Sequence, residues 1–284
     1  MARHNFFEKL EREINIQFEY EKIENIVLNE LNEYCFTLND QIEENFYNWK
    51  FKKNYLSFEE LRNYMGFTYS ESRNGVKIAT AEVKNIDDFI LYCEMIYNMI
   101  FCVVADSIEY NFSEPTLNVL RIIQYDIEKM NHNIICLKQN EQYLIVQKNP
   151  AASAVADIVK PDLADSIIEY NHHLLKGKLK EKQLILKMIA DALEPKRQEL
   201  KMVDRKIESD FFYMVNCMNV RHNNCDASDL KKYNPEFAVL KDEQKESWYD
   251  EIYQEGLMAF LLLEQTKREK RIQKFKDSKV SSYM

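Results

Sequence analysis

Apolar residues recur at helical spacing through most of this 284-residue chain. In residues 5–35 they return every three or four positions with acidic residues between them, which is the pattern of amphipathic helices. The same spacing predicts helices over residues 86–110, from residue 114 onward, and from Ser57, where "SFEE" matches a capping box. Only four glycines and five prolines occur, too few turn residues for an all-β protein. The pattern therefore predicts a mainly α fold.

Two stretches depart from helical spacing and predict one or two small β-hairpins in the N-terminal region. "SRNGVKIATAEV" places β-branched residues around Asn74-Gly75, a common hairpin turn. "IICLKQNEQYLIVQKNP" holds two short strand-like runs around Gln139–Glu141. Pro150, the small residues of "AASAVAD" and Pro161 then shift the composition. We expect an acidic, mainly helical region over 1–150 to end at this junction.

Four further helical segments predict a separate C-terminal domain. They cover residues 161–175, 178–193, 206–222 and 246–271, and Gly177, Pro195 and Pro235 lie between them. Short links make successive helices antiparallel. We therefore expect an antiparallel helical bundle over 161–275, followed by a basic and polar tail at 276–284.

Charge is unevenly distributed between the two halves. Residues 1–150 hold 15 of the 38 basic and 24 of the 47 acidic residues, so the net charge of −9 belongs to the first half. An acidic surface repels a phosphate backbone, so any nucleic-acid contact is expected in the second half. The strongest basic run is "KREKRIQKFKDSK" from Lys267. It is either the solvated end of a helix or an electrostatic contact for RNA.

The sequence offers no pattern for a metal, a cofactor or a membrane span. Its six cysteines and five histidines are scattered, without the paired spacing of a zinc site. The most apolar run, from Met95, is too short to cross a bilayer. No motif for nucleotide, dinucleotide, zincin or serine-hydrolase chemistry occurs. Without a signal sequence at the start, the expected location is the cytoplasm.

The stretch "MNVRHNNCD", from Met218 to Asp226, puts polar chemistry at the end of the third predicted bundle helix. Continued helical spacing extends the apolar stripe of Phe211, Val215 and Met218 to His222. Arg221 lies about 100° around the same helix. Asparagine and histidine near a helix end also cap free carbonyl groups, so a purely structural role is the alternative. The amides that would flank His222 are those of Asn216, Asn219 and Asn223.

An Arg-His-Asn cluster that closes the third helix of a C-terminal bundle resembles the HEPN superfamily. Those helical domains occur in bacterial toxin, abortive-infection and phage-defence proteins, and many act as metal-independent ribonucleases. The resemblance covers roughly residues 161–275. The family's histidine usually follows the arginine after four to six residues, but Asp226–Ser228 stand there in this chain. His222 would therefore supply the histidine's function from the position next to Arg221.

The resemblance implies RNA cleavage by a base and a cation. His222 would take the proton of the 2′-hydroxyl group, and Arg221 would stabilise the charged phosphorane. Two adjacent histidines in "EYNHHLL" are further candidates: either one is buried and the other exposed, or one faces His222 across the bundle. The candidate supporting residues are Asn219, Asn223, Asn224, His172 and His173.

These observations favour an RNA-directed effector of a bacterial defence or toxin system, with Arg221 and His222 as the ribonuclease residues. The resemblance further implies RNA as the ligand, a homodimer in which two third helices meet, and a partner protein of the same defence system. One alternative is a non-catalytic interaction or dimerisation module. Another is a regulatory, antitoxin-like role for the acidic N-terminal region.

Overall fold

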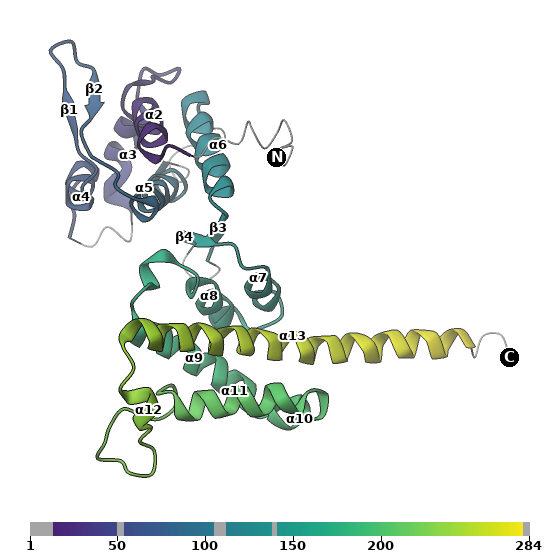
Figure 1. Cartoon of the computed structure of the whole chain (residues 1–284). Coiled ribbons are helices and arrows are strands. Elements are labelled where there is room, and N and C mark those ends of the chain that lie inside the picture. The colour runs from purple at the N-terminus through teal and green to yellow at the C-terminus, as the bar shows by residue number, and fades with distance from the viewer. Residues whose placement is uncertain (1–13, 50–53, 105–111, 138–140, 281–284) are drawn as a thin grey trace, which may run out of the picture. The chain divides into compact units, whose positions relative to one another are not determined.

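The computed structural model describes residues 14–49, 54–104, 112–137 and 141–280 of the chain (Figure 1). The chain divides into two compact units, residues 1–145 and 146–284, and each is described by itself. Helices dominate both units, which confirms the mainly α class. Among the described helices, none combines the length and the apolar character needed to cross a membrane.

The first unit surrounds one hydrophobic core with short helices and a small sheet. The core includes Tyr20, Phe58, Phe89 and Tyr92, all fully buried. Edge-to-face contact between Tyr20 and Tyr92, whose ring centres lie 4.7 Å apart, links two of these helices. The elements are α2 (Ile16–Asn29), α3 (Leu38–Asn45), α4 (Phe58–Met65), β1 (Tyr69–Glu71), β2 (Lys77–Ala79), α5 (Ile86–Met99), the π-helical turn η2 (Ile100–Val104), α6 (Glu114–Lys129), β3 (His132–Cys136) and β4 (Tyr143–Gln147), which reaches the second unit.

Local signals place most of these element boundaries. Ser57 caps α4, as predicted: its side chain accepts a hydrogen bond from the N–H of Glu60 at 3.0 Å. The carboxylate of Glu60 accepts from the N–H of Leu56 at 2.8 Å, so the reciprocal bond of a capping box goes to the residue before the cap. β1 and β2 pair antiparallel, and Gly75 takes a positive φ of 78° in the turn between them. β3 and β4 form the second two-stranded sheet. Both predicted hairpins are therefore confirmed, although residues 138–140 of the second turn lie outside the described residues.

A buried ion pair inside the first unit has no counterpart in the sequence analysis. Arg62 of α4 is 1% exposed and binds the carboxylate of Glu24 of α2, which is fully buried. The hydroxyl group of Tyr20 donates to the same carboxylate at 3.2 Å. Burial of two charges is tolerated only when they are paired, so this contact fixes α2 against α4.

The second unit has its own core, built mainly from four longer helices. Ile189, Phe211, Ile252 and Leu257 lie at its centre and are fully buried. The elements are α7 (Pro150–Ala156), α8 (Pro161–Glu169), α9 (Leu179–Leu193), α10 (Arg197–Val203), α11 (Arg205–Cys217), α12 (Pro235–Ala238) and α13 (Asp242–Val280).

The longer helices alternate in direction along the chain, as expected for an antiparallel bundle. Tyr170, just after α8, contacts Asp250, whereas Ile167 contacts Tyr253 further along α13, so α8 and α13 run in opposite directions. The start of α9 contacts the end of α11 through Gln183, and Glu208 near the start of α11 binds Arg197, just after α9. α9 and α11 are therefore antiparallel too.

Three predicted boundaries were wrong. The first bundle helix, α8, ends at Glu169, so Asn171, His172 and His173 follow it instead of lying on it. The third, α11, ends at Cys217 and does not reach His222. The fourth, α13, begins at Asp242 and continues to Val280, so it is longer at both ends than the predicted 246–271 and passes the boundary expected at 275. The small residues assigned to the interdomain junction form α7, and Ala152 and Val155 of α7 pack into the second core.

Candidate functional site

Arg221 lies beyond the end of α11 and turns its side chain toward α9. After Cys217 the chain reverses at Asn219, whose φ is 60°, and the N–H of Arg221 bonds to the carbonyl of Val215 at 3.0 Å. The guanidinium group binds the carboxylate of Glu194 and donates to the carbonyl of Ala190 at 3.0 Å. It therefore caps the C-terminal turn of α9, where a cation complements the helix dipole.

A series of ion pairs connects Arg221 through Glu194 and Arg197 to Glu208. Glu194 also lies 3.8 Å from Arg197, which binds Glu208 of α11 at 2.6 Å. The ring of Phe212 lies beneath both guanidinium groups, with ring-to-Cζ distances of 4.3 Å for Arg197 and 5.6 Å for Arg221. With its charge matched by Glu194, Arg221 has a well-defined structural role.

Asparagine side chains fix the loop that carries His222. The side-chain oxygen of Asn224, a buried residue, accepts from the N–H of Asn219 at 2.8 Å. Its amide donates to the carbonyl of Lys232, while Asn234 donates to the carbonyl of Cys217 at 2.9 Å. Burial raises the pKa of Tyr249 to about 12 against the opposing effect of its hydrogen bond with Asn219. Asn219 and Asn224 therefore hold the loop in place, whereas Asn223 is exposed.

His222 lines a hollow of about 540 Å³ beside the end of α11. Lys231 and Lys232 line the same hollow from the loop before α12, and Tyr213 and Asn216 line it from α11. The lining residues of the hollow thus include a histidine, two lysines, two tyrosines (Tyr213 and Tyr233) and one acidic residue, Glu236. Arg221 is not among the described residues that line it. The two predicted catalytic residues therefore do not share a site: His222 faces the hollow, whereas Arg221 faces α9.

His172 and His173 lie in the turn that follows α8. The backbone of His172 forms an antiparallel bridge with Val146, and the two imidazole rings are 4.4 Å apart. Neither histidine is among the residues that line the hollow of His222. His172 is buried and His173 is half-buried, which is closest to the first of the two alternatives for this pair.

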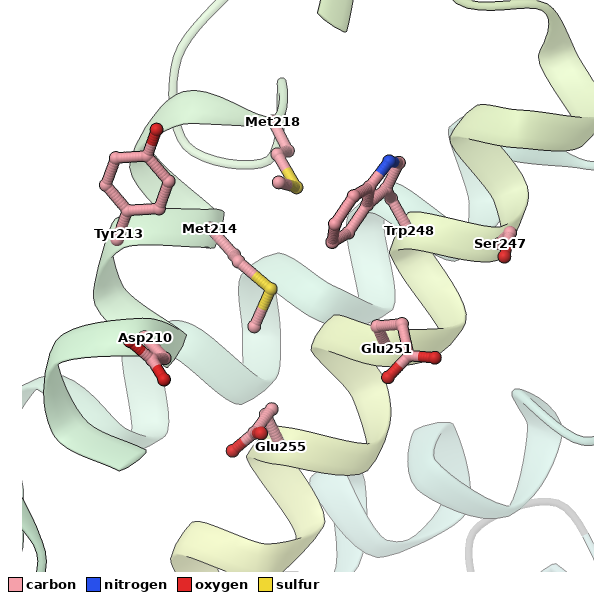
Figure 2. Close-up of a pocket in the computed structure, with 8 residues that line it drawn as sticks. All are labelled: Asp210, Tyr213, Met214, Met218, Ser247, Trp248, Glu251 and Glu255. Atoms are coloured by element: carbon pink, nitrogen blue, oxygen red, sulfur yellow. The ribbon is translucent and has the colours of Figure 1, made fainter. Parts of the chain in front are cut away.

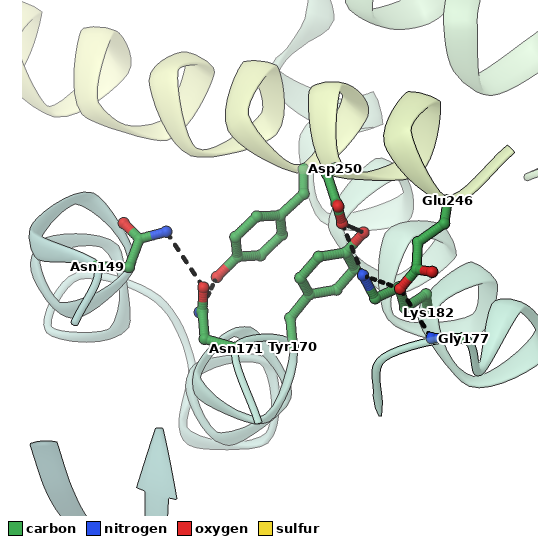
Figure 3. A network of polar contacts seen from close by, with 8 residues as sticks. Asn149, Tyr170, Asn171, Gly177, Lys182, Glu246 and Asp250 are labelled. Atoms are coloured by element: carbon green, nitrogen blue, oxygen red, sulfur yellow. Dashed lines mark hydrogen bonds and ion pairs between the residues drawn. The ribbon is translucent and has the colours of Figure 1, made fainter. Parts of the chain in front are cut away.

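A polar network that the sequence analysis missed holds this turn against α13 (Figure 3). Lys182 binds both Glu246 and Asp250 at 2.8 Å, and the hydroxyl group of Tyr170 donates to Asp250 at 2.9 Å. Tyr170 stacks on Tyr253 with ring centres 4.0 Å apart. Since the lysine is matched by two carboxylates, this network stabilises the bundle and offers no free cation to a ligand.

A second hollow, of about 580 Å³, lies between α11 and α13 (Figure 2). Met214 of α11 and Met218, which directly follows this helix, project toward Trp248 of α13, and acidic side chains border this apolar floor. Trp248 is 42% exposed, whereas its neighbour Tyr249 is buried. We call this hollow the acidic groove; its lining residues are Asp210, Tyr213, Met214, Met218, Ser247, Trp248, Glu251 and Glu255.

The acidic groove contains a carboxylate in an unfavourable environment. Burial and the nearby carboxylates of Asp210 and Glu251 raise the pKa of Glu255 above its usual range. Its Oε2 is buried without a hydrogen-bond partner among the described residues. A cation placed in this groove would relieve that cost. The described residues contain no cluster of three or more potential metal ligands.

No family model, curated protein or solved structure matches this chain.

Proposed function

We propose that this protein is an RNA-directed effector of a bacterial defence or toxin system, which binds and cleaves RNA at the hollow of His222 without a metal ion. One observation carries the proposal: His222 shares a hollow of about 540 Å³ with Lys231 and Lys232. Two lysines and a histidine that line one hollow supply a phosphate-binding charge and a proton acceptor to the same space. The resemblance of the bundle to the HEPN superfamily supports the same reaction class.

The proposed reaction needs only groups that line this hollow. His222 accepts the proton of the 2′-hydroxyl group as its oxygen attacks phosphorus, and the bond from phosphorus to the 5′-oxygen breaks. Lys231 or Lys232 stabilises the charge of the phosphorane, and the leaving oxygen takes up a proton from solvent. The products are a 2′,3′-cyclic phosphate and a 5′-hydroxyl group. In this version Arg221 positions the loop through Glu194 and does not contact the phosphate.

The test combines RNA cleavage in EDTA with binding and melting measurements on matched variants. His222→Ala should lower the cleavage rate by about 10²–10⁴-fold while leaving RNA affinity nearly intact. The double variant Lys231→Ala/Lys232→Ala should weaken RNA binding and reduce its salt dependence. Lys241→Ala, an exposed lysine that is not among the residues lining the hollow, is the control for loss of charge.

Arg221→Ala tests whether Arg221 has a structural role, as proposed here, or stabilises the phosphorane, as the resemblance implied. Because its guanidinium group caps α9, its loss should lower the melting temperature by the equivalent of about 1.5–3 kcal/mol. At temperatures where the variant stays folded, cleavage should persist. If the wild-type protein neither binds nor cleaves single-stranded RNA in EDTA or in magnesium, the proposal is refuted.

The ion pairs of Arg221 favour a second candidate, a non-catalytic interaction module. The predicted phosphorane-stabilising arginine is held by Glu194, with Asp191 3.8 Å away. In this candidate the polar loop closes the bundle, and the protein acts through partner binding. RNA binding that is unaffected by His222→Ala, with no cleavage by any variant, would support this candidate over the ribonuclease.

A further inference from the structure

The longest helix carries a largely exposed stripe along its outer side. α13 extends well past the rest of its bundle (Figure 1), and its side chains are exposed from Lys267 to Ser278. Residues on the stripe alternate in spacing of four and three, the repeat of a left-handed coiled coil. Met258, Ile272 and Phe275 are 48%, 53% and 62% exposed, respectively. The stripe consists of Ser247, Glu251, Gln254, Met258, Leu261, Gln265, Arg268, Ile272 and Phe275.

The two ends of this stripe carry opposite charge. Glu251 lies at the N-terminal end, beside Glu255 and Asp210 of the acidic groove. The C-terminal end is basic, because its six Lys and Arg residues outnumber Glu269 and Asp277. A parallel pair of such helices would bring like charges together, whereas an antiparallel pair would bring opposite charges together. The basic residues are Lys267, Arg268, Lys270, Arg271, Lys274 and Lys276.

We propose that a second copy of this chain packs antiparallel along the stripe of α13, giving a two-fold symmetric dimer. With the axis between Met258 and Leu261, each Met258 meets Leu261 of the second copy at the centre. On either side, Glu251 meets Arg268 of the second copy. Gln254 and Gln265 meet between these two layers. Every layer of the stripe from 251 to 268 thus finds a compatible partner in the other copy.

In the proposed dimer, basic side chains that flank the stripe of one copy lie beside the acidic groove of the other. In this register Arg271 of the second copy lies level with Trp248, where a guanidinium group can stack on the indole ring. Arg268 of the second copy lies one helical turn from Glu255, the carboxylate that burial disfavours. Glu264 lies level with Glu255 of the second copy, but Lys267, Arg268 and Arg271 of its own helix lie 3.3, 3.9 and 3.2 Å from its carboxylate and offset its charge.

A second copy explains the stripe better than a nucleic acid does. RNA would use the cations of the C-terminal half, but it would be repelled by Glu251, Glu255 and Asp210 and would leave Met258 exposed. The second copy uses both halves at once. This surface lies on the fourth long helix, whereas the resemblance implied that dimers form through the third.

Sedimentation of the full-length protein at micromolar concentrations, with a charge-swap cycle, tests this interface. Glu251→Lys and Arg268→Glu should each weaken dimerisation by about tenfold or more, because each introduces two repulsive pairs into the symmetric dimer. The double variant Glu251→Lys/Arg268→Glu should restore the wild-type affinity. Within one chain these residues are 17 positions apart on a single helix, so the rescue can arise only between copies.

Lys270→Glu provides the matched control. Lys270 is exposed and lies about 200° around the helix from Arg268, so the same change of charge should leave the dimer intact. Circular dichroism should show unchanged helicity in every variant. A monomeric wild type, or single reversals that the swap does not rescue, would overturn the proposal. Equal loss of RNA affinity in Arg268→Glu and Lys270→Glu, without a dimer, would instead assign the extension to nucleic acid.

Discussion

At the scale of single residues, Asp126 on α6 couples the stability of the first unit to pH. The residue is 2% exposed, and its Oδ2 is buried without a hydrogen-bond partner among the described residues. Burial, reinforced by the carboxylate of Glu19, raises the pKa of Asp126 from 3.8 to about 6. The folded state therefore holds the proton more tightly than the unfolded state does. This contribution to stability is complete below about pH 4 and is lost as the pH rises through about 6.

Asp126→Asn should consequently stabilise the first unit at neutral pH. The amide is nearly isosteric and carries no charge, so we expect a gain of about 1–2 kcal/mol in the free energy of unfolding at pH 8 and almost none at pH 4. Denaturant unfolding at several pH values measures the difference. Glu128→Gln, which makes the same charge change at an exposed position of α6, should show no such dependence. A variant less stable than the wild type at pH 8 would contradict this account.

At this scale the sequence identified which polar residues lie in one segment, but it did not predict where their side chains point. The cluster of Arg221, His222 and Asn224 was identified from residue types alone. The sequence could not show that Glu194 binds Arg221, because the two residues are 27 positions apart and meet only after the bundle has formed. Lys231 and Lys232 were missed as partners of His222 for a related reason. They belong to an irregular loop whose return path is fixed by Asn224 and Asn234.

At the scale of secondary-structure elements, the end of an element could be predicted from the sequence only where neighbouring residues determine it. The hairpin at Asn74-Gly75 and the helix start at Ser57 were predicted because neighbouring residues determine them. The end of α11 was not, because apolar periodicity continues through Met218 while the chain turns at Asn219. That left-handed turn is held by a side chain of the following loop. Periodicity alone therefore extends a helix past its true end.

A close helix crossing at Gly256 gives a prediction at the same scale. A Cβ atom at this position of α13 would lie 2.7 Å from Cγ2 of Ile189 and 3.2 Å from the ring of Phe211. Alanine favours a helix over glycine by about 1 kcal/mol, but overpacking a rigid core costs about 1–3 kcal/mol. Ile189 and Phe211 are fully buried, so the overpacking should win. Gly256→Ala should therefore lower the melting temperature of the second unit.

The sign of the Gly256 effect can be reversed to test its cause. In an Ile189→Ala background the opposing methyl group is absent, so Gly256→Ala should become neutral or stabilising through helix preference alone. Lys270→Ala, at an exposed position of α13 outside the stripe, controls for general effects on the helix. If Gly256→Ala destabilises both backgrounds equally, the contact with Ile189 is not the cause.

At the scale of the whole molecule, the division of the chain follows from two separate cores. The residues of the first core all precede residue 146 and those of the second all follow it. The shift in composition predicts a junction near residues 150–161, whereas the compact units meet at 145 and 146. The difference arises because the small, proline-bounded segment is a helix, α7, that packs into the second core. Composition detects a change of segment, but only packing shows to which core the segment belongs.

Two cores predict two separable unfolding transitions in the full-length chain. Asp126→Asn acts in the first core and Gly256→Ala in the second, so each should shift one calorimetric transition and leave the other in place. Effects at distant, independent sites add, and the double variant should therefore show both shifts at once, one upward and one downward at pH 8. The transition that moves upward then belongs to the first unit, and the transition that moves downward belongs to the second. Dimerisation through α13 adds a further signature, because only the transition of the second unit should rise with protein concentration. A single cooperative transition that both substitutions move together would contradict the independence of the two units.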